Sequence, residues 1–202
     1  MSSIALIDYG AGNLRSVHNA LVAAGAGDVA VTADPDIVAK ADRIVLPGVG
    51  AFAACMNGLS AIDGLVDAME RRVRGDGAPF LGICVGMQLL ADAGEEHGTH
   101  KGLGWIGGTV RAFDPAPGLR IPHMGWNDVI PATAHPVIAA GEAYFLHGYH
   151  FAETADVAAT SDHGGAFVAA VARDNIVGVQ YHPEKSQAYG LATLERFLKW
   201  RP

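Results

Sequence analysis

A cysteine set between two glycines is the most reactive feature of this sequence. Cys84 stands in GICVG at 82–86, after an apolar stretch and before a helix-like one. This spacing is typical of a nucleophile elbow, where glycines admit contacts that a Cβ would block. An elbow would raise the sulfur above the carboxyl end of a sheet, at a helix N-terminus that favours thiolate. It would also aim the Val85 amide at a developing oxyanion. A small buried hydrophobe at a tight turn is the alternative for this cysteine.

A general base for such a cysteine stands near the other end of the chain. His182 and Glu184 flank a proline in YHPEK, directly after the strand-like segment 176–181. Residues two apart in an extended segment project to the same side. The carboxylate can therefore orient the imidazole ring while its other nitrogen takes the thiol proton. Each residue alone could be an ordinary loop residue, but with an elbow cysteine they predict a Cys84–His182–Glu184 triad.

The elements that must position these residues predict an α/β fold. The first half of the chain alternates strand-like and helix-like segments, including helices expected over 59–74 and 85–93. Such alternation, with nearly continuous apolar strands, is typical of a mostly parallel sheet with helices on both faces, as in flavodoxin-like folds. Short segments punctuated by Gly and Pro over 105–181 predict added antiparallel strands. With no repeat or linker, we expect residues 1–202 to form a single domain.

Composition narrows the classes of partner and ligand. Half of the 202 residues are hydrophobic, 17% are charged and the net charge is −7, which argues against nucleic acid as the main partner. No apolar run is long enough for a membrane span, and the N-terminus does not resemble a signal peptide, so a cytoplasmic protein is expected.

A disulfide between Cys55 and Cys84 is disfavoured because the sequence carries no export signal. No histidine pair has zincin spacing, and GAGNLR at 10–15 is only a partial dinucleotide fingerprint. We expect neither metal nor cofactor.

Seven motifs together resemble the class I (triad-type) glutamine amidotransferases. Two carry the triad, GICVGMQ at 82–88 and QYHPE at 180–184. The others are DYGAGN at 8–13, LPGVGAF at 46–52, PHMGWN at 122–127, YFLHGYH at 144–150 and HPEKS at 182–186. They lie in the expected order over nearly the whole chain. The set is most similar to the branch of the family that supplies ammonia for histidine biosynthesis.

The resemblance implies a reaction and a role for each matching residue. Cys84 would attack the side-chain amide of L-glutamine, ammonia would leave, and water would hydrolyse the glutamyl thioester, with His182 as base and then acid. The second oxyanion donor would come from the PGVG turn, at Val49 or Gly50. Substrate contacts are implied for two residues, Gly48 and Gln88. A strand-ending turn and a solvated helix glutamine are the plainer interpretations of these two positions.

The resemblance also implies a protein partner. Members of this branch hand ammonia to a synthase (cyclase) subunit with a (β/α)8 barrel, in a heterodimer. The matching interface residues are Asn13, Tyr149 and Lys185, which an N-cap, a half-buried tyrosine and a solvated lysine would explain equally well. Two positions depart from the family pattern, Gly148 and His150, and they bear on the contacts to the glutamine backbone and to the partner.

Three other functions fit part of the sequence. A glutaminase serving pyridoxal phosphate or aminobenzoate synthesis would keep the chemistry and change the pathway. A non-catalytic subunit could keep the fold and only bind a partner, although the intact triad argues against it. A thiol hydrolase acting on another amide would use the triad but leave the remaining motifs unexplained.

Overall fold

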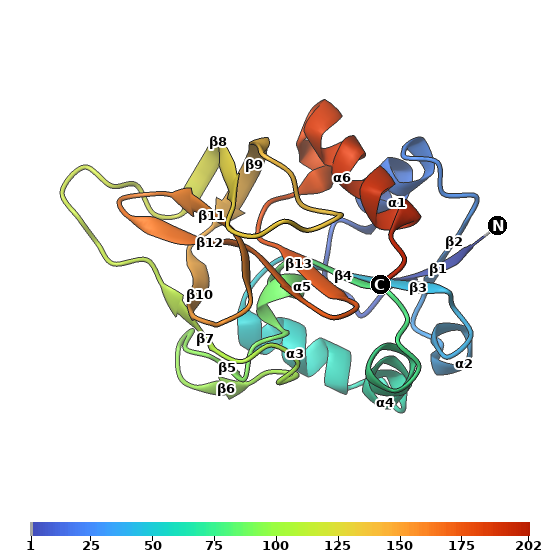
Figure 1. Cartoon of the computed structure of the whole chain (residues 1–202). Helices are drawn as coiled ribbons and strands as arrows, with labels where there is room; N and C mark the ends of the chain where they lie inside the picture. Colours follow the sequence, from blue (N-terminus) through green and yellow to red (C-terminus); the bar gives the residue numbers. More distant parts are fainter. Residues whose placement is uncertain (1) are drawn as a thin grey trace.

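The computed structural model describes residues 2–202, which build a large nine-stranded sheet and a small four-stranded sheet (Figure 1). The strands of the large sheet lie in the order β2-β1-β3-β4-β13-β12-β11-β8-β9. Their bounds along the chain are β1 Ser3–Ile7, β2 Asp28–Thr32, β3 Arg43–Gly48, β4 Phe80–Cys84, β8 His123–Pro131, β9 Gly141–His147, β11 Val157–Asp162, β12 Ala166–Arg173 and β13 Ile176–Val179. The sheet thus combines strands from both halves of the chain.

Five neighbouring strands of the large sheet, β2, β1, β3, β4 and β13, are parallel. β3 and β4 are buried at every residue because helices cover both faces. In Figure 1, α1 and α6 lie over one face and α3 and α4 over the other. The helices are α1 Leu14–Ala23, α2 Pro35–Val38, α3 Phe52–Ser60, α4 Leu65–Glu70, the π-turn η1 Arg71–Gly75, α5 Val85–Gln88, the 3₁₀ turn η2 Pro183–Lys185 and α6 Gln187–Lys199. The predicted doubly covered parallel sheet is confirmed.

The predicted antiparallel strands of the second half are confirmed as well. β12, β11, β8 and β9 extend the large sheet in antiparallel pairs. The small sheet contains β5 Ala93–Gly94, β6 His100–Lys101, β7 Thr109–Ala112 and β10 Tyr149–Glu153. Gly148 alone separates β9 from β10, so the chain passes there from one sheet to the other.

Two predicted helices have wrong bounds. The expected helix over 59–74 is two helices, since Leu59 belongs to α3 and α4 starts only after Gly64, whose φ of 73° breaks the helix. The expected helix over 85–93 ends at Gln88. The carbonyls of Leu89, Leu90 and Ala91 instead accept hydrogen bonds from backbone N–H groups of residues 103–106, so the chain bends back toward the small sheet.

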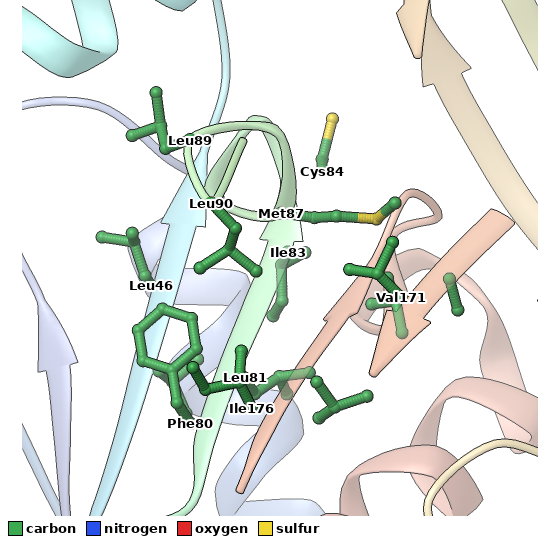
Figure 2. Close-up of a cluster of buried hydrophobic side chains, with 14 of the residues drawn as sticks. Leu46, Phe80, Leu81, Ile83, Cys84, Met87, Leu89, Leu90, Val171 and Ile176 are labelled. Atoms are coloured by element: carbon green, nitrogen blue, oxygen red, sulfur yellow. The ribbon is translucent and has the colours of Figure 1, made fainter. Parts of the chain in front are cut away.

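The core reaches the carboxyl end of β4. Figure 2 shows apolar side chains of β3, β4 and β13 packed beneath the elbow, with the Cys84 sulfur pointing away from them. Within residues 2–202, none of the helices combines the length and apolar character that crossing a membrane requires.

Candidate active site

Cys84 is held in a strained backbone conformation at the junction of β4 and α5. Its φ of 54° and ψ of −112° are unusual for a residue with a side chain. The flanking glycines permit this bend. A Cβ on Gly86 would lie 1.9 Å from the Leu46 carbonyl oxygen, and one on Gly82 would lie 2.6 Å from the Gly86 oxygen. The G-x-C-x-G spacing is therefore required by the close approach of α5 to β3 and β4.

The structure brings the three predicted triad residues together. His182 follows β13, the parallel neighbour of β4, so both strands end at the same edge of the sheet. Nδ1 of His182 lies 2.9 Å from Oε1 of Glu184, and neither side chain is more than 2% exposed. Cys84 and His182 line one cavity. The arrangement has the order nucleophile, base, orienting carboxylate.

The environment of His182 favours the charged ring. Burial opposes the charge, but hydrogen bonds and the negative charges of Cys84 and Glu184 outweigh it and raise the pKa of His182 to about 10. At neutral pH the His182 ring is therefore protonated. His182 is poised to act as an acid toward a leaving group.

The helix that follows the cysteine is shorter than expected. α5 is a single turn, Val85–Gln88, so its dipole contributes less to thiolate stability than the predicted longer helix would. The first residue of a helix has no intrahelical partner for its N–H. The Val85 amide is therefore free of an intrahelical partner, and Val85 lines the cavity beside the cysteine.

Two buried side chains hold the PGVG turn at the end of β3. The Tyr9 hydroxyl donates to the Pro47 carbonyl at 2.8 Å, and the Cys55 thiol approaches the Val49 carbonyl at 3.4 Å. In a trans peptide the N–H points opposite to the C=O. Engaging the Val49 carbonyl with Cys55 therefore turns the Gly50 N–H the other way. The two cysteines are free thiols.

A cavity of about 240 Å³ surrounds the sulfur. It is smaller than the roughly 300–1,000 Å³ of sites for drug-sized ligands, which suits a small metabolite. It is lined by Val49, Gly50, Cys84, Val85, Gln88, Glu96, Leu146, His147, Gly148, Tyr149, His182 and Lys185. Eight of the predicted site residues are among them, drawn from both halves of the chain.

Three predicted residues do not line the cavity. Glu184 lies behind His182, as an orienting group should. Gly48 lies beneath the elbow, where a Cβ would be 2.7 Å from the Gly86 nitrogen. Gly48 therefore packs closely against α5. Asn13 precedes α1 without a side-chain capping hydrogen bond.

Gln88 is buried, with 3% of its surface exposed, so the interpretation as a solvated helix residue is wrong. Its Nε2 donates to the Tyr149 carbonyl at 2.8 Å and to Oε1 of Gln180 at 3.1 Å. Of the two positions that depart from the family pattern, Gly148 lines the cavity. His150 is absent from the lining and stacks on Phe113, with ring centroids 4.4 Å apart.

The structure adds two titratable cavity residues that were not predicted from the sequence, Glu96 and His147. Glu96 accepts a hydrogen bond from the Phe52 N–H at 2.7 Å, which fixes its carboxylate at the start of α3. Burial lowers the pKa of His147 to about 3, so that ring is neutral. His147 stands in YFLHGYH, but no sequence signal marks Glu96. Within residues 2–202, no three His, Cys, Asp or Glu side chains are grouped so as to hold a metal ion.

The profile of the family described as "Glutamine amidotransferase class-I" matches residues 5–199. The chain belongs to this family. Two relatives, each named "Imidazole glycerol phosphate synthase subunit HisH", are similar over the full length. The protein of Zymomonas mobilis is 59% identical, with 100% of this chain and 97% of that protein aligned. The protein of Caulobacter vibrioides is 53% identical, with 100% of both aligned.

These similarities confirm the predicted branch of the family and the predicted enzyme class, a glutamine amidotransferase and glutaminase. A solved structure described as "Crystal structure of glutamine amidotransferase" has a TM-score of 0.76 to this amidotransferase, at 18% identity, over 96% of this chain and 97% of that one. At that identity the likeness concerns the fold, which is confirmed.

Proposed function

We propose that this chain is the glutaminase subunit of an imidazole glycerol phosphate synthase and that Cys84, His182 and Glu184 carry its chemistry. The observation that supports the roles most directly is the buried His182–Glu184 pair, 2.9 Å apart, beside a cysteine at the edge of a small cavity. The substrate is L-glutamine, and the products are glutamate and ammonia.

The reaction proceeds through two acyl transfers. The Cys84 thiolate adds to the side-chain amide carbon of glutamine, and the resulting oxyanion accepts hydrogen bonds from the Val85 N–H and from the turn at Val49 and Gly50. The imidazolium of His182 gives its proton to the amide nitrogen, the C–N bond breaks, and ammonia leaves. The neutral ring then takes a proton from water, whose oxygen attacks the thioester carbon. Glutamate departs as the C–S bond breaks and the thiolate–imidazolium pair is restored.

The cavity residues suit the two ends of glutamine. The Glu96 carboxylate is the acidic side chain on its wall and is placed to bind the α-ammonium group. Both N–H groups of Gln88 are engaged by protein acceptors, which leaves its Oε1 for the substrate. Gly48 supports this site by close packing under the elbow rather than by direct contact.

Ammonia passes from this site to a synthase (cyclase) subunit with a (β/α)8 barrel, which forms imidazole glycerol phosphate and AICAR and gives the complex its lyase activity. The name of the HisH relatives, which describes them as subunits, supports a partner. Exposed apolar side chains at Ile121, Met124 and Trp126 support a docking face. We assign Asn13, Tyr149 and Lys185 to the interface of this heterodimer. The chain acts as a single amidotransferase domain in the cytoplasm and needs no cofactor.

The test measures ammonia release from glutamine by the full chain, alone and with a barrel synthase subunit carrying its ligand. We expect weak activity alone and strong stimulation by the partner, because unstimulated hydrolysis would waste glutamine. Cys84→Ala should lose activity by several orders of magnitude in both conditions, since triad residues act as a unit. Full activity without the partner would contradict the proposed coupling. Persistent hydrolysis by Cys84→Ala would contradict the proposed nucleophile.

A further inference from the structure

We propose that Gln180 is a further catalytic residue, whose side-chain amide donates a hydrogen bond to the Cys84 sulfur; this rests on the proposed role of Cys84 as nucleophile. Gln180 follows β13 directly, two residues before His182, and is completely buried. Its Nε2 lies 3.8 Å from the sulfur. The side chain reaches the nucleophile although the two residues are 96 positions apart in the chain.

A chain of contacts determines which end of the Gln180 amide faces the sulfur. The Tyr149 carbonyl can only accept hydrogen bonds, so the Gln88 atom that lies 2.8 Å from it must be the nitrogen. The second hydrogen of that nitrogen points to Gln180, and the atom 3.1 Å away must be its oxygen. The Gln180 nitrogen is therefore turned toward Cys84.

Besides His182, the sulfur has two hydrogen-bonding neighbours with opposite preferences for its protonation state. The Leu146 carbonyl oxygen, 3.8 Å away, can accept a hydrogen bond from a thiol but offers nothing to a thiolate. The Gln180 N–H stabilises the thiolate, because a donor to the charged form favours that form. Removing the Gln180 amide would leave only His182 to oppose the preference of the Leu146 carbonyl for the thiol. The amide thus favours the thiolate form of the nucleophile before glutamine binds.

The same contacts connect the sulfur to the proposed partner face. Tyr149 is assigned to the interface, and its carbonyl also lies 2.9 Å from Nδ1 of His147. A displacement of the Tyr149 backbone on docking would move Gln88, then Gln180, and so change the donor at the sulfur. Gln88→Met should therefore slow alkylation of Cys84 less than loss of Gln180 itself, because it frees the Gln180 amide without removing it.

The test is alkylation of the full chain by iodoacetamide, with the rate at each cysteine followed by mass spectrometry between pH 6 and 9. Gln180→Met removes the donor at similar size, and we expect the rate at Cys84 to fall about tenfold at neutral pH and to recover at high pH. Gln180→Glu keeps the shape but places a carboxylate beside the sulfur, and it should slow Cys84 further. Cys55 is the internal reference, and its rate should not change.

Rates at Cys84 equal to wild type in both variants would overturn the role of Gln180. If neither variant folds, the hydrogen bond can be tested with Gln180 unchanged. The NMR resonance of its side-chain amide protons should shift when Cys84 is replaced by alanine. An unchanged resonance would contradict the hydrogen bond. A separate result would contradict the proposed function: Cys84→Ala would still release ammonia from glutamine, while the Gln180 variants would show the expected alkylation rates.

Discussion

Nδ1 of His182 lies 2.9 Å from Oε1 of Glu184, and the two side chains are no more than 2% and 1% exposed. Water cannot replace this carboxylate as the partner of the charged ring. The pair therefore fixes the ring orientation and leaves the other ring nitrogen for the sulfur.

Replacing Glu184 by glutamine should reduce kcat by on the order of 10³- to 10⁴-fold, because the amide cannot stabilise the imidazolium to the same degree. The measurement is steady-state ammonia release in the presence of the synthase partner. Glu195→Gln, at a half-exposed carboxylate of α6, is the matched control and should leave kcat unchanged. A Glu184→Gln enzyme within tenfold of wild type would show that the carboxylate does not serve the triad.

Gly86→Ala should destabilise the fold by at least about 3 kcal/mol, because its Cβ would lie 1.9 Å from the Leu46 carbonyl oxygen and backbone would have to move. Chemical denaturation of the full chain measures this free energy of unfolding. Gly75→Ala is the control, since nothing lies within 4 Å of its added Cβ and no positive φ is required there. Equal unfolding free energies for the two variants would argue against the close packing of the elbow.

Tyr9→Phe removes the hydroxyl that donates to the Pro47 carbonyl at 2.8 Å, so we expect a loss of about 1–3 kcal/mol of stability. Because that carbonyl belongs to the turn proposed as an oxyanion donor, kcat should fall as well. Tyr189 of α6 donates a comparable hydrogen bond, to the Ala139 carbonyl at 2.7 Å, which Tyr189→Phe removes. This second variant should lose stability but keep kcat, and a matching drop in its kcat would refute a specific role for Tyr9.

Stability should fall in acid because His147 is buried as a neutral ring. Burial and the neighbouring histidines 123, 150 and 163 lower the pKa of His147 to about 3, against about 6.5 in the unfolded chain. Below pH 6.5 His147 binds a proton in the unfolded state but not in the folded state. This difference lowers the free energy of unfolding progressively from pH 6.5 down to about 3.

The check is the free energy of unfolding at pH 8 and pH 5. His147→Asn can keep the donor to the Tyr149 carbonyl and should show a smaller loss on acidification than wild type. The exposed His97 provides a control, since His97→Asn should leave the pH dependence unchanged. An unaltered pH dependence in His147→Asn would mean that another group governs acid unfolding.

The fold class, the elbow at Cys84 and the pairing of His182 with Glu184 could be predicted because they depend on short-range patterns. Gly82, Cys84 and Gly86 encode a bend, and the His-Pro-Glu triplet encodes a fixed spacing, whatever surrounds them. The ends of helices were harder to predict where long-range contacts compete with the local preference for a helix. The helix after Cys84 stops at Gln88 because backbone groups from residues 103–106 take the next carbonyls, and no periodicity within 85–93 reveals that competition.

The sequence by itself determined the chemistry of this protein, because a thiol at an elbow and an imidazole beside a carboxylate are specified by residue type and local spacing. Only the tertiary structure decided what surrounds the sulfur. The strand order places β13 beside β4 and brings Gln180 to Cys84, while the bend after Gln88 brings Glu96 into the cavity. Such neighbours arise from packing between distant segments, which no local pattern records.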